Sequence, residues 1–552
     1  MKKINLIYVF LVGMVLALSL TGCQDTLNTD SQSSLMKDKF YTTQGNMDRA
    51  LIGVYGCLKP FSTYYFAMSE NRSDNMLNIT ESKKNEYADC AQFNSTGLLN
   101  DNIVYNCWAD HYALIAAANA LLANVNNISY TREGTATQYA AEARFLRALA
   151  YFDLVRFFGR VPVSTQELTV AEAFNLKQSE PAQVYEQIVE DLTYAEENLA
   201  DEAKDYTGAT RAERATKTAA QALLGKVYMQ MAGYPLYDAT AQDKAKEYLG
   251  KVLTTVGLLS GGNVVAGATP SKYWALDADE WNNMWFHEND NRYFIFEIQY
   301  ACSKNQGNPM TPLTHKSESS KTKFCNANLV VGPHAYVERS FVANHFVGAD
   351  NVDEEGIPLD KRYPNSINLI PESSSSDDDI IASDGDAFMP KFFEHKVKRS
   401  TYGYADMDDQ IVDRTYWPQN FPILRLEDVM LLYAECVGKA EGLPLLNLIH
   451  SRAMDYSYPS SLSESRFQQY VMEERRIELL GEGHRWFDEV RHKTFVNDIK
   501  AKFEYYRENC DRNHSPKYSV YANQVTVNGR YYPIPLSQMQ VRDGLYTQNE
   551  GY

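Results

Sequence analysis

The sequence predicts a mainly α-helical fold in which paired helices form a scaffold beside a loop-rich region with few short strands. Apolar residues recur every three or four positions in several long segments, which is the spacing of one helix face. Glycine and proline residues end most of these segments. Residues 257–422 are instead dense in Gly, Ser, Asn, Asp and Pro, which is typical of connecting loops.

The helical segments occupy both ends of the chain. The clearest pattern lies in 137–158, where Phe145, Leu149 and Phe152 follow at helical spacing and Gly159 ends the helix. Pro181 suits the first position of another helix. The same criteria predict helices over residues 43–57, 102–125, 137–158, 181–199, 216–231, 243–253, 425–441 and 465–492.

One helix pair has a repeat signature. The run Leu224-Gly225-Lys226-Val227-Tyr228 matches the L-G-x-x-Y core of a tetratricopeptide helix, where glycine lets the partner helix approach. A single match has little specificity. Several helix pairs of the same size nevertheless predict a layer of tetratricopeptide-like pairs.

The middle of the chain has a different pattern. Residues 294–300 alternate between apolar and polar and predict a short strand, whereas 373–379 is a polar, acidic run of low complexity. Long segments without regular structure are usually functional loops. We therefore expect an irregular region packed on the helices.

Composition and charge exclude several classes of protein. The chain has 552 residues, a formal net charge of −18 and a mean hydropathy of −0.42. This hydropathy excludes a protein with many membrane spans, and the negative field repels the phosphates of nucleic acids. The 38 Tyr, 24 Phe and 6 Trp residues supply rings for a core and for sugar faces alike.

The N-terminus resembles an export and lipidation signal. Two lysines precede an apolar run over 4–20, which has the length of a signal peptide. The run Leu20-Thr21-Gly22-Cys23 then resembles a bacterial lipobox, in which the cysteine thiol accepts a diacylglycerol. We expect a signal peptide over 1–22 and a polar tether over 23–34 that carries lipid on Cys23.

The other seven cysteines do not form a recognisable framework. Their number is odd and no CxxC pair occurs, so neither a zinc ribbon nor a regular disulfide pattern is supported. Cys302 and Cys325 are the nearest pair within a loop and could form a bridge in an exported protein. Cys436 lies in a helical pattern and is expected to be a small buried hydrophobe.

Clustered charges near the C-terminus predict structural ion pairs. Arg475 and Glu478, Glu478 and Glu482, and Arg485 and Glu489 are three or four positions apart, which places each pair on one helix face. A partly buried network that locks helices together explains this pattern better than catalysis does. The same interpretation applies to a second group further upstream, which consists of Arg144, Arg147 and Asp153. It also applies to Arg425 with Glu427 and Asp428.

The sequence favours neither a metal site nor an enzyme. His484, Asp488 and His492 share a helix face, but two turns separate the outer pair by about 12 Å, which is too far for one ion. A glycoside hydrolase needs two opposed carboxylates, and no motif singles out such a pair. The motifs of serine hydrolases, P-loop proteins and zinc proteases are absent. We therefore expect no catalytic residue, no metal and no cofactor.

Two regions have the composition of a carbohydrate site, where aromatic rings meet sugar faces and planar polar groups order the hydroxyls. The first region runs from Tyr64 to Asn94. The second region covers Tyr273 to Trp285 and the 301–330 loop, and its best stacking candidates are Trp274 and Trp281. The candidate ligand-binding residues of the first region are Tyr64, Tyr65, Arg72, Asp74, Asn75, Phe93 and Asn94, and those of the second are Tyr273, Trp274 and Trp281.

Four segments together resemble the SusD/RagB family of outer-membrane nutrient-binding lipoproteins. The first runs from Ala143 to Pro162 and contains the run Ala143-Arg144-Phe145-Leu146-Arg147-Ala148. The others are Leu424 to Glu435, Glu473 to Arg491, and the ending from Pro533-Ile534-Pro535 to Gln548-Asn549. Glu550 departs from the family, which often has proline before the final Gly-Tyr.

The resemblance implies a scaffold of four tetratricopeptide-like helix pairs and a variable loop-rich region that carries the ligand site. It also implies a TonB-dependent transporter of the SusC class as partner, to which the lipoprotein hands captured oligosaccharide without catalysis. The loop after Ser73-Asp74 contributes to the ligand site in the family, which supports Asp74 and the loop through Asn94. The tryptophans of starch-binding members have no counterpart there.

The sequence therefore predicts a SusD-like glycan-binding lipoprotein anchored at the outer membrane. The alternative is a helical-repeat assembly or scaffold lipoprotein that binds only proteins or peptides. An exposed cluster of rings favours the first function, and a bare polar concave face favours the second. The expected parts of the mature chain are an N-terminal helical part, a loop-rich variable region and a C-terminal helical part, over residues 35–256, 257–422 and 423–552.

Overall fold

The computed structural model describes residues 40–78, 86–286, 290–301, 305–310, 336–354, 356–370, 386–388, 391, 419–509 and 515–552. Several predictions lie outside these residues: the signal peptide, Cys23 and its tether, the acidic run 373–379, and the cysteine pair at 302 and 325. Within the described part of the chain, none of the helices combines the length and the apolar character that a membrane span requires.

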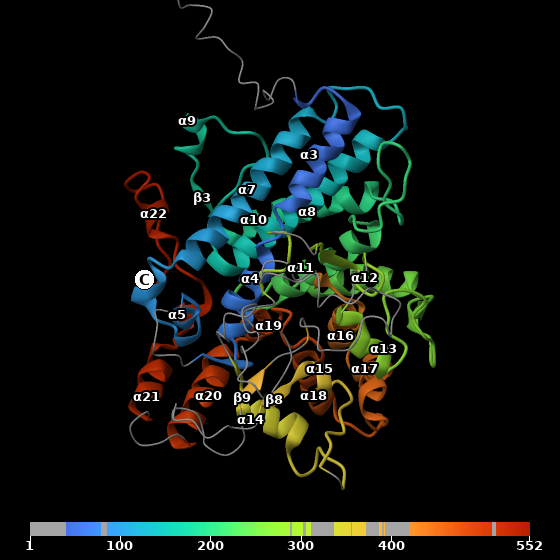
Figure 1. Cartoon of the computed structure of the whole chain (residues 1–552), viewed down its shortest axis with the longest axis vertical. Helices are drawn as coiled ribbons and strands as arrows, with labels where there is room; N and C mark the ends of the chain where they lie inside the picture. Colours follow the sequence, from blue (N-terminus) through green and yellow to red (C-terminus); the bar gives the residue numbers. More distant parts are fainter. Residues whose placement is uncertain are drawn as a thin grey trace, which may run out of the picture.

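Long antiparallel helices build the N-terminal half (Figure 1). Helix α8 packs against both α7 and α10, α11 packs against α10 and α12, and α12 reaches α16 in the C-terminal half. The predicted helices of this half are thus present, with ends shifted by at most two residues. Their bounds are α3 Gln44–Gly56, α7 Asn102–Asn124, α8 Thr135–Phe158, α10 Pro181–Asn198, α11 Lys217–Ala232 and α12 Ala241–Thr255.

The tetratricopeptide-like pair is α11 with α12. A Cβ atom at Gly225 would lie 2.5 Å from the Leu249 side chain and 3.2 Å from its backbone nitrogen. Only a residue without a side chain permits this approach of the two helices. The glycine of the repeat motif therefore has the packing role that the sequence predicted.

The C-terminal half contains helices that the sequence pattern left out. Helix α17 follows α16 directly after Gly438, despite Pro444 inside it. The predicted helix over 465–492 is interrupted, because Gly481 and Gly483 adopt φ of 84° and 76°. The bounds are α16 Leu426–Val437, α17 Lys439–Met454, α18 Glu464–Glu478, α19 Arg485–Arg491, α20 Phe495–Asn509, α21 Ser515–Gln524 and α22 Leu536–Met539.

Short elements connect these layers. The described strands form two-stranded antiparallel sheets, as expected for a fold with few short strands. The pairs are β1 Met76–Leu77 with β7 Tyr336–Val337, β2 Val161–Pro162 with β3 Gln178–Ser179, β4 Leu259–Ser260 with β5 Asn263–Val264, β6 Phe296–Ile298 with β10 Phe421–Leu424, and β8 Asn368–Ile370 with β9 Asp386–Phe388. The short helices are α4 Phe61–Tyr64, α5 Glu86–Gln92, α6 Ser95–Leu98, α9 Val170–Ala173, α13 Ala278–Asn283, α14 Arg339–Val342 and α15 Tyr363–Ser366.

The end of the chain is joined to its first half. The Tyr532 backbone nitrogen donates to the Phe157 carbonyl at 2.7 Å. The side-chain amide of Asn549 donates to the carbonyls of Phe158 and Tyr532 at 2.8 and 2.7 Å. These bonds occupy acceptors at the last turn of α8, so the C-terminus lies against the helical scaffold (Figure 1).

Candidate functional site

The first predicted ligand region lies mostly in the core. The Arg72 guanidinium carbon stands 4.0 Å from the ring centre of Phe93 and 4.3 Å from that of Tyr532, and its nitrogens donate to the Cys90 and Gly529 carbonyls. The rings and backbone oxygens around Arg72 therefore occupy a side chain that was expected to face a ligand. The other buried members are Tyr64, Tyr65, Asp74, Asn75 and Phe93.

Asp74 and Asn75 connect the N-terminal segment to the C-terminal helices. Asp74 accepts two hydrogen bonds from Arg485 at 2.8 and 2.9 Å, and the side chain of Asn75 accepts one from Arg476 at 2.7 Å. Burial alone would raise the pKa of Asp74, but the two guanidinium groups lower it below its usual range. Both residues thus stabilise the fold. Asn94 is half-buried, and its side-chain oxygen caps α6.

The second predicted region is also covered. Trp281 is fully buried, and its indole nitrogen donates to Glu478 at 2.7 Å. Trp274 is 8% exposed, and the guanidinium of Arg452 lies 4.1 Å from the centre of its ring. The half-buried Tyr273 packs against the hydrophobic core. The expectation that Trp274 and Trp281 stack on sugars therefore disagrees with the structure, in which protein groups occupy both rings.

The charged residues near the C-terminus form a buried network around Glu478. This carboxylate accepts hydrogen bonds from Arg362, Arg425 and Arg452, and burial, which would raise its pKa, is outweighed by these cations. Glu482 accepts from Arg425 at 2.7 Å and from Lys391 at 2.6 Å. Since Arg362 and Lys391 come from the loop-rich region, the network joins that region to α18.

Individual partners differ from those that sequence spacing suggested. Arg475 pairs with Asp428 at 2.7 Å and with Asp488 at 2.9 Å, and the structure gives it no ion pair with Glu478. The predicted partners are found for Arg485 with Glu489, at 3.5 Å, and for Arg425 with Glu427, at 3.2 Å. Spacing along one helix failed elsewhere because neighbouring helices supply closer carboxylates.

The upstream group was likewise predicted with wrong partners. Arg147 binds Asp191 on α10 through two hydrogen bonds of 2.8 and 2.7 Å, and Arg144 lies 3.6 Å from the same carboxylate. Asp153 pairs instead with Arg156, one turn further along α8, and with His111 on α7 at 3.3 Å. These pairs hold α8 to its two neighbours.

The described residues contain one group of acids with the spacing of metal ligands. Oxygen atoms of Asp74, Glu489 and Asp498 lie within 4.8 Å of one another. Arg485 contacts all three carboxylates, at 2.8, 3.5 and 3.8 Å, so a guanidinium already occupies the position of the countercharge. Nearby, His484 Nδ1 lies 2.8 Å from the Lys226 ammonium.

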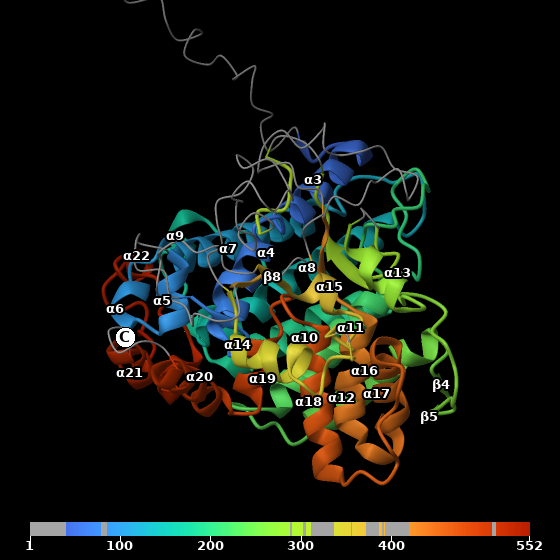
Figure 2. The same cartoon turned by 60° about the horizontal axis from the view of Figure 1, so that its bottom comes forward.

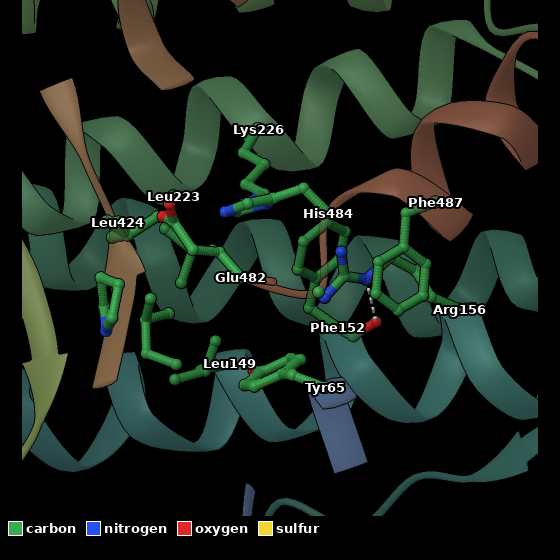
Figure 3. Close-up of a pocket in the computed structure, with 13 residues that line it drawn as sticks. Tyr65, Leu149, Phe152, Arg156, Leu223, Lys226, Leu424, Glu482, His484 and Phe487 are labelled. Atoms are coloured by element: carbon green, nitrogen blue, oxygen red, sulfur yellow. Dashed lines mark hydrogen bonds between the residues drawn. The ribbon is translucent and has the colours of Figure 1, made fainter. Parts of the chain in front are cut away.

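A small cavity lies at the centre of the helices (Figure 3). Tyr65, Phe152, Arg156, Lys226 and His484 line it, and its volume of 20 Å³ accommodates about one water molecule. Burial and the nearby Lys226 keep the pKa of His484 well below its ordinary value. This cavity is a structural feature and is too small for a sugar.

The exposed face at the start of α7 offers a better binding surface. Tyr105 is 42% exposed, and Asn102 and Asn106 are exposed beside it, since positions i, i+3 and i+4 share a helix face. One turn further along, Asp110 accepts a hydrogen bond from the Tyr64 hydroxyl. We call this surface the α7 face. Sequence analysis missed it, although the Asn-x-x-Tyr-Asn spacing at a helix start was visible.

The segment that precedes Tyr64 contacts the loop-rich region. The Lys59 ammonium donates to the Gln306 side chain, and the Ser62 hydroxyl donates to Asn308 at 3.0 Å. The Tyr300 hydroxyl donates to the carbonyl of Lys59 at 2.7 Å. The segment that holds Tyr64 against α7 therefore also holds Tyr300, Gln306 and Asn308. Figure 2 shows α4, which contains Tyr64, beside α7.

Comparison with known proteins identifies the family. The model of the SusD family matches residues 285–552, and a model described as starch-binding associating with outer membrane matches residues 25–229. The chain is 25% identical over 524 residues to SusD-like protein P38 of Formosa agariphila, and this alignment covers 89% of this chain and 91% of that protein.

Solved structures share the fold. A SusD homolog from Bacteroides thetaiotaomicron aligns with a TM-score of 0.73 at 23% identity, over 94% of this chain and 98% of the other. A structure described as a laminarin binding SusD-like protein aligns with a TM-score of 0.65 at 23% identity, over 93% of this chain and all of the other. The predicted mainly helical, SusD-like architecture is thereby confirmed, and the chain belongs to the SusD/RagB family as a SusD-like protein.

Proposed function

We propose that this protein is a cell-surface lipoprotein that binds oligosaccharide noncovalently and delivers it to a SusC-like TonB-dependent transporter of the outer membrane. The observation that carries the proposal is the exposed ring of Tyr105 on the α7 face, flanked by Asn102 and Asn106. An aromatic ring beside planar amides is suited to the apolar face and the hydroxyls of a sugar.

The comparisons support the choice of ligand. The description of one matched family model names starch, and that of one structural neighbour names laminarin, and both are glucose polymers. A rigid helix bearing the ring reduces the entropy lost on binding. The ion pairs of Glu478 and Asp74 support a binding role over hydrolysis, since arginines hold both carboxylates in their charged forms.

The binding test compares two exposed tyrosines. Tyr105→Ala should weaken oligosaccharide binding by about 1–3 kcal/mol, as the loss of an aromatic anchor typically does. Tyr456→Ala is the matched control, because Tyr456 is 53% exposed and lies outside the α7 face. Calorimetry on the body from Gln24 onward, after a glycan-array screen for the ligand, measures both variants. Equal affinities of wild type and Tyr105→Ala would exclude the α7 face.

The anchor and the transporter need separate tests. Cys23→Ala should move the protein from the membrane fraction to the soluble fraction, and it should abolish labelling by an alkyne analogue of palmitate. Affinity purification of the tagged native protein from outer membranes should recover a TonB-dependent transporter. Membrane retention of the Cys23→Ala protein, or purification without any such transporter, would contradict the corresponding part of the proposal.

A further inference from the structure

A second hollow, whose lining includes none of the residues of the α7 face, lies where three distant chain segments meet. Its walls come from the end of α8 and the start of α10, from the turn at residues 233–237, and from the C-terminal tail. The volume is 490 Å³, within the range of about 300–1,000 Å³ that small-ligand sites occupy. We call it the tail groove, and its principal lining residues are Arg160, Glu180, Pro181, Pro235, Arg530 and Tyr531.

The walls of the tail groove are fixed by contacts to the scaffold. The Tyr234 nitrogen donates to the Arg491 carbonyl at 2.8 Å, which attaches the turn to α19. A Cβ atom at Gly159 would lie 2.9 Å from the Tyr531 ring, so that ring packs directly on the backbone after α8. The Tyr552 hydroxyl donates to the Tyr531 carbonyl at 3.0 Å. The groove is therefore formed before any ligand arrives.

The groove combines an aromatic and aliphatic surface with polar groups. The Arg530 guanidinium carbon lies 5.0 Å from the ring centre of Tyr531 and 5.7 Å from that of Tyr234. Pro181 and Pro235 add aliphatic C–H surface to the lining. Rings and C–H groups of this kind pack against the apolar face of a sugar, while guanidinium and carboxylate groups bind its hydroxyls in pairs.

The charges of the lining favour a neutral ligand. Arg160 and Arg530 face the same hollow as Glu180 and Glu550, so the formal charges of the lining cancel within a chain of net charge −18. The two carboxylates repel a polyanion and the two guanidinium groups repel a polycation. Uncharged hydroxyls, in contrast, form hydrogen bonds with both kinds of group. We propose that the tail groove is a second saccharide-binding site that takes a neutral oligosaccharide segment.

This inference rests on the proposed function of saccharide capture, but not on the α7 face being the capture site. Two sites on one body retain a long polysaccharide better than either site alone, because the second binding event becomes intramolecular. The tail groove is thus expected to matter most for long chains. A short oligosaccharide should bind the two sites independently.

The test blocks the tail groove at a position that contributes nothing to the core. Ala182 lines the groove and is exposed in the first turn of α10, so Ala182→Trp fills the hollow with an indole. Ala501 is also exposed, on α20, and does not line the groove, which makes Ala501→Trp the matched control. Arg530→Ala is a second groove variant that removes a polar contact without adding bulk. Near-identical unfolding midpoints verify that each variant is folded.

The measurement is affinity electrophoresis of the body from Gln24 in native gels that contain laminarin, glycogen or xyloglucan. Ala182→Trp and Arg530→Ala should weaken retention by at least about threefold, and Ala501→Trp should leave it unchanged. Calorimetry with the hexasaccharide of the retained polymer should show one binding site in Ala182→Trp where the wild type has two.

The remaining outcomes separate the two proposals. If Tyr105→Ala weakens retention while both groove variants match wild type, the tail groove is overturned and saccharide capture stands. If only the groove variants weaken retention, the tail groove stands and the α7 face is excluded. If wild type is retained in none of the gels, saccharide capture is overturned together with this inference. Retention that falls with added peptide or sulfate but not with hexasaccharide assigns the groove to another ligand and also overturns it.

Discussion

Removing Arg425 should test whether the buried ion-pair network stabilises the fold. Arg425 is fully buried, and it pairs with Glu482 at 2.7 Å, with Glu427 at 3.2 Å and with Glu478. It also donates to the Glu478 carbonyl at 3.2 Å. Methionine has a similar length but no charge, so Arg425→Met leaves these three acids without one of their cations.

The magnitude follows from the composition of the network. In the wild type the buried acids already outnumber the buried cations by one, and the variant raises this excess to two. The acids are Asp360, Glu427, Glu474, Glu478 and Glu482, and the cations are Arg362, Lys391, Arg425 and Arg452. Removing one member of a buried pair typically costs about 3–5 kcal/mol, which is the loss expected here.

The assay is urea unfolding of the body from Gln24, followed by circular dichroism and repeated for a surface control. Lys251→Met removes a cation whose side chain is 37% exposed and whose carboxylate partners lie at 3.6 and 3.4 Å. Exposed pairs contribute about 0–1 kcal/mol, so this variant should unfold near the wild-type midpoint.

A double variant, Arg425→Met with Glu482→Gln, removes one charge of each sign. It should recover part of the lost stability, because the excess of buried acids returns to that of the wild type. If Arg425→Met lowers the unfolding free energy no more than Lys251→Met does, the network is not a source of stability and this reasoning is refuted.

Three further predictions concern stability. Burial raises the pKa of Glu297 to about 8 from an ordinary 4.5. As the pH rises between these two values, wild-type stability should therefore fall by up to about 1.4 kcal/mol per pH unit. In urea unfolding, the unfolding free energy of Glu297→Gln relative to that of wild type should therefore rise from pH 5 to pH 8. Parallel pH profiles of the two proteins would contradict this. Gly225→Ala should cost about 1–3 kcal/mol of stability through its clash with Leu249, and the additional change Leu249→Ala should relieve that clash. Calorimetric unfolding midpoints measure both variants, and strictly additive losses of stability would oppose the packing argument. Trp281→Ala should cost about 3–5 kcal/mol of stability because the ring is fully buried, and a wild-type thermal midpoint would show that it is not part of the core.

Much of the scaffold could be predicted because long amphipathic helices have a local signal. Helix α8 shows this well, since its apolar spacing and Gly159 gave both its position and its end. Helix α17 was missed because Pro444 argues against a helix, and tertiary contacts override that preference. One of these contacts lies at Gly442, where a Cβ atom would stand 2.8 Å from the Phe467 ring.

The binding residues were harder to predict, because composition does not distinguish a covered ring from an exposed one. Arg72 and Phe93 have the residue types of a sugar site, yet their partners include Trp486, Gly529 and Tyr532, which follow more than 390 positions later in the sequence. No local pattern indicates such contacts. Tyr105, by contrast, could have been found from the polar residues at i−3 and i+1, which share its helix face.

The junction between the chain's end and α8 has a consequence for the order of folding. The carbonyls in the last turn of α8 accept hydrogen bonds from Tyr532 and Asn549, and Arg72 obtains one of its enclosing rings from Tyr532. A growing polypeptide cannot complete these layers until Tyr532 and Asn549 have emerged. Deleting the segment from Tyr532 onward should therefore leave a long-lived open intermediate that proteases cut early, in helices that lie hundreds of positions upstream.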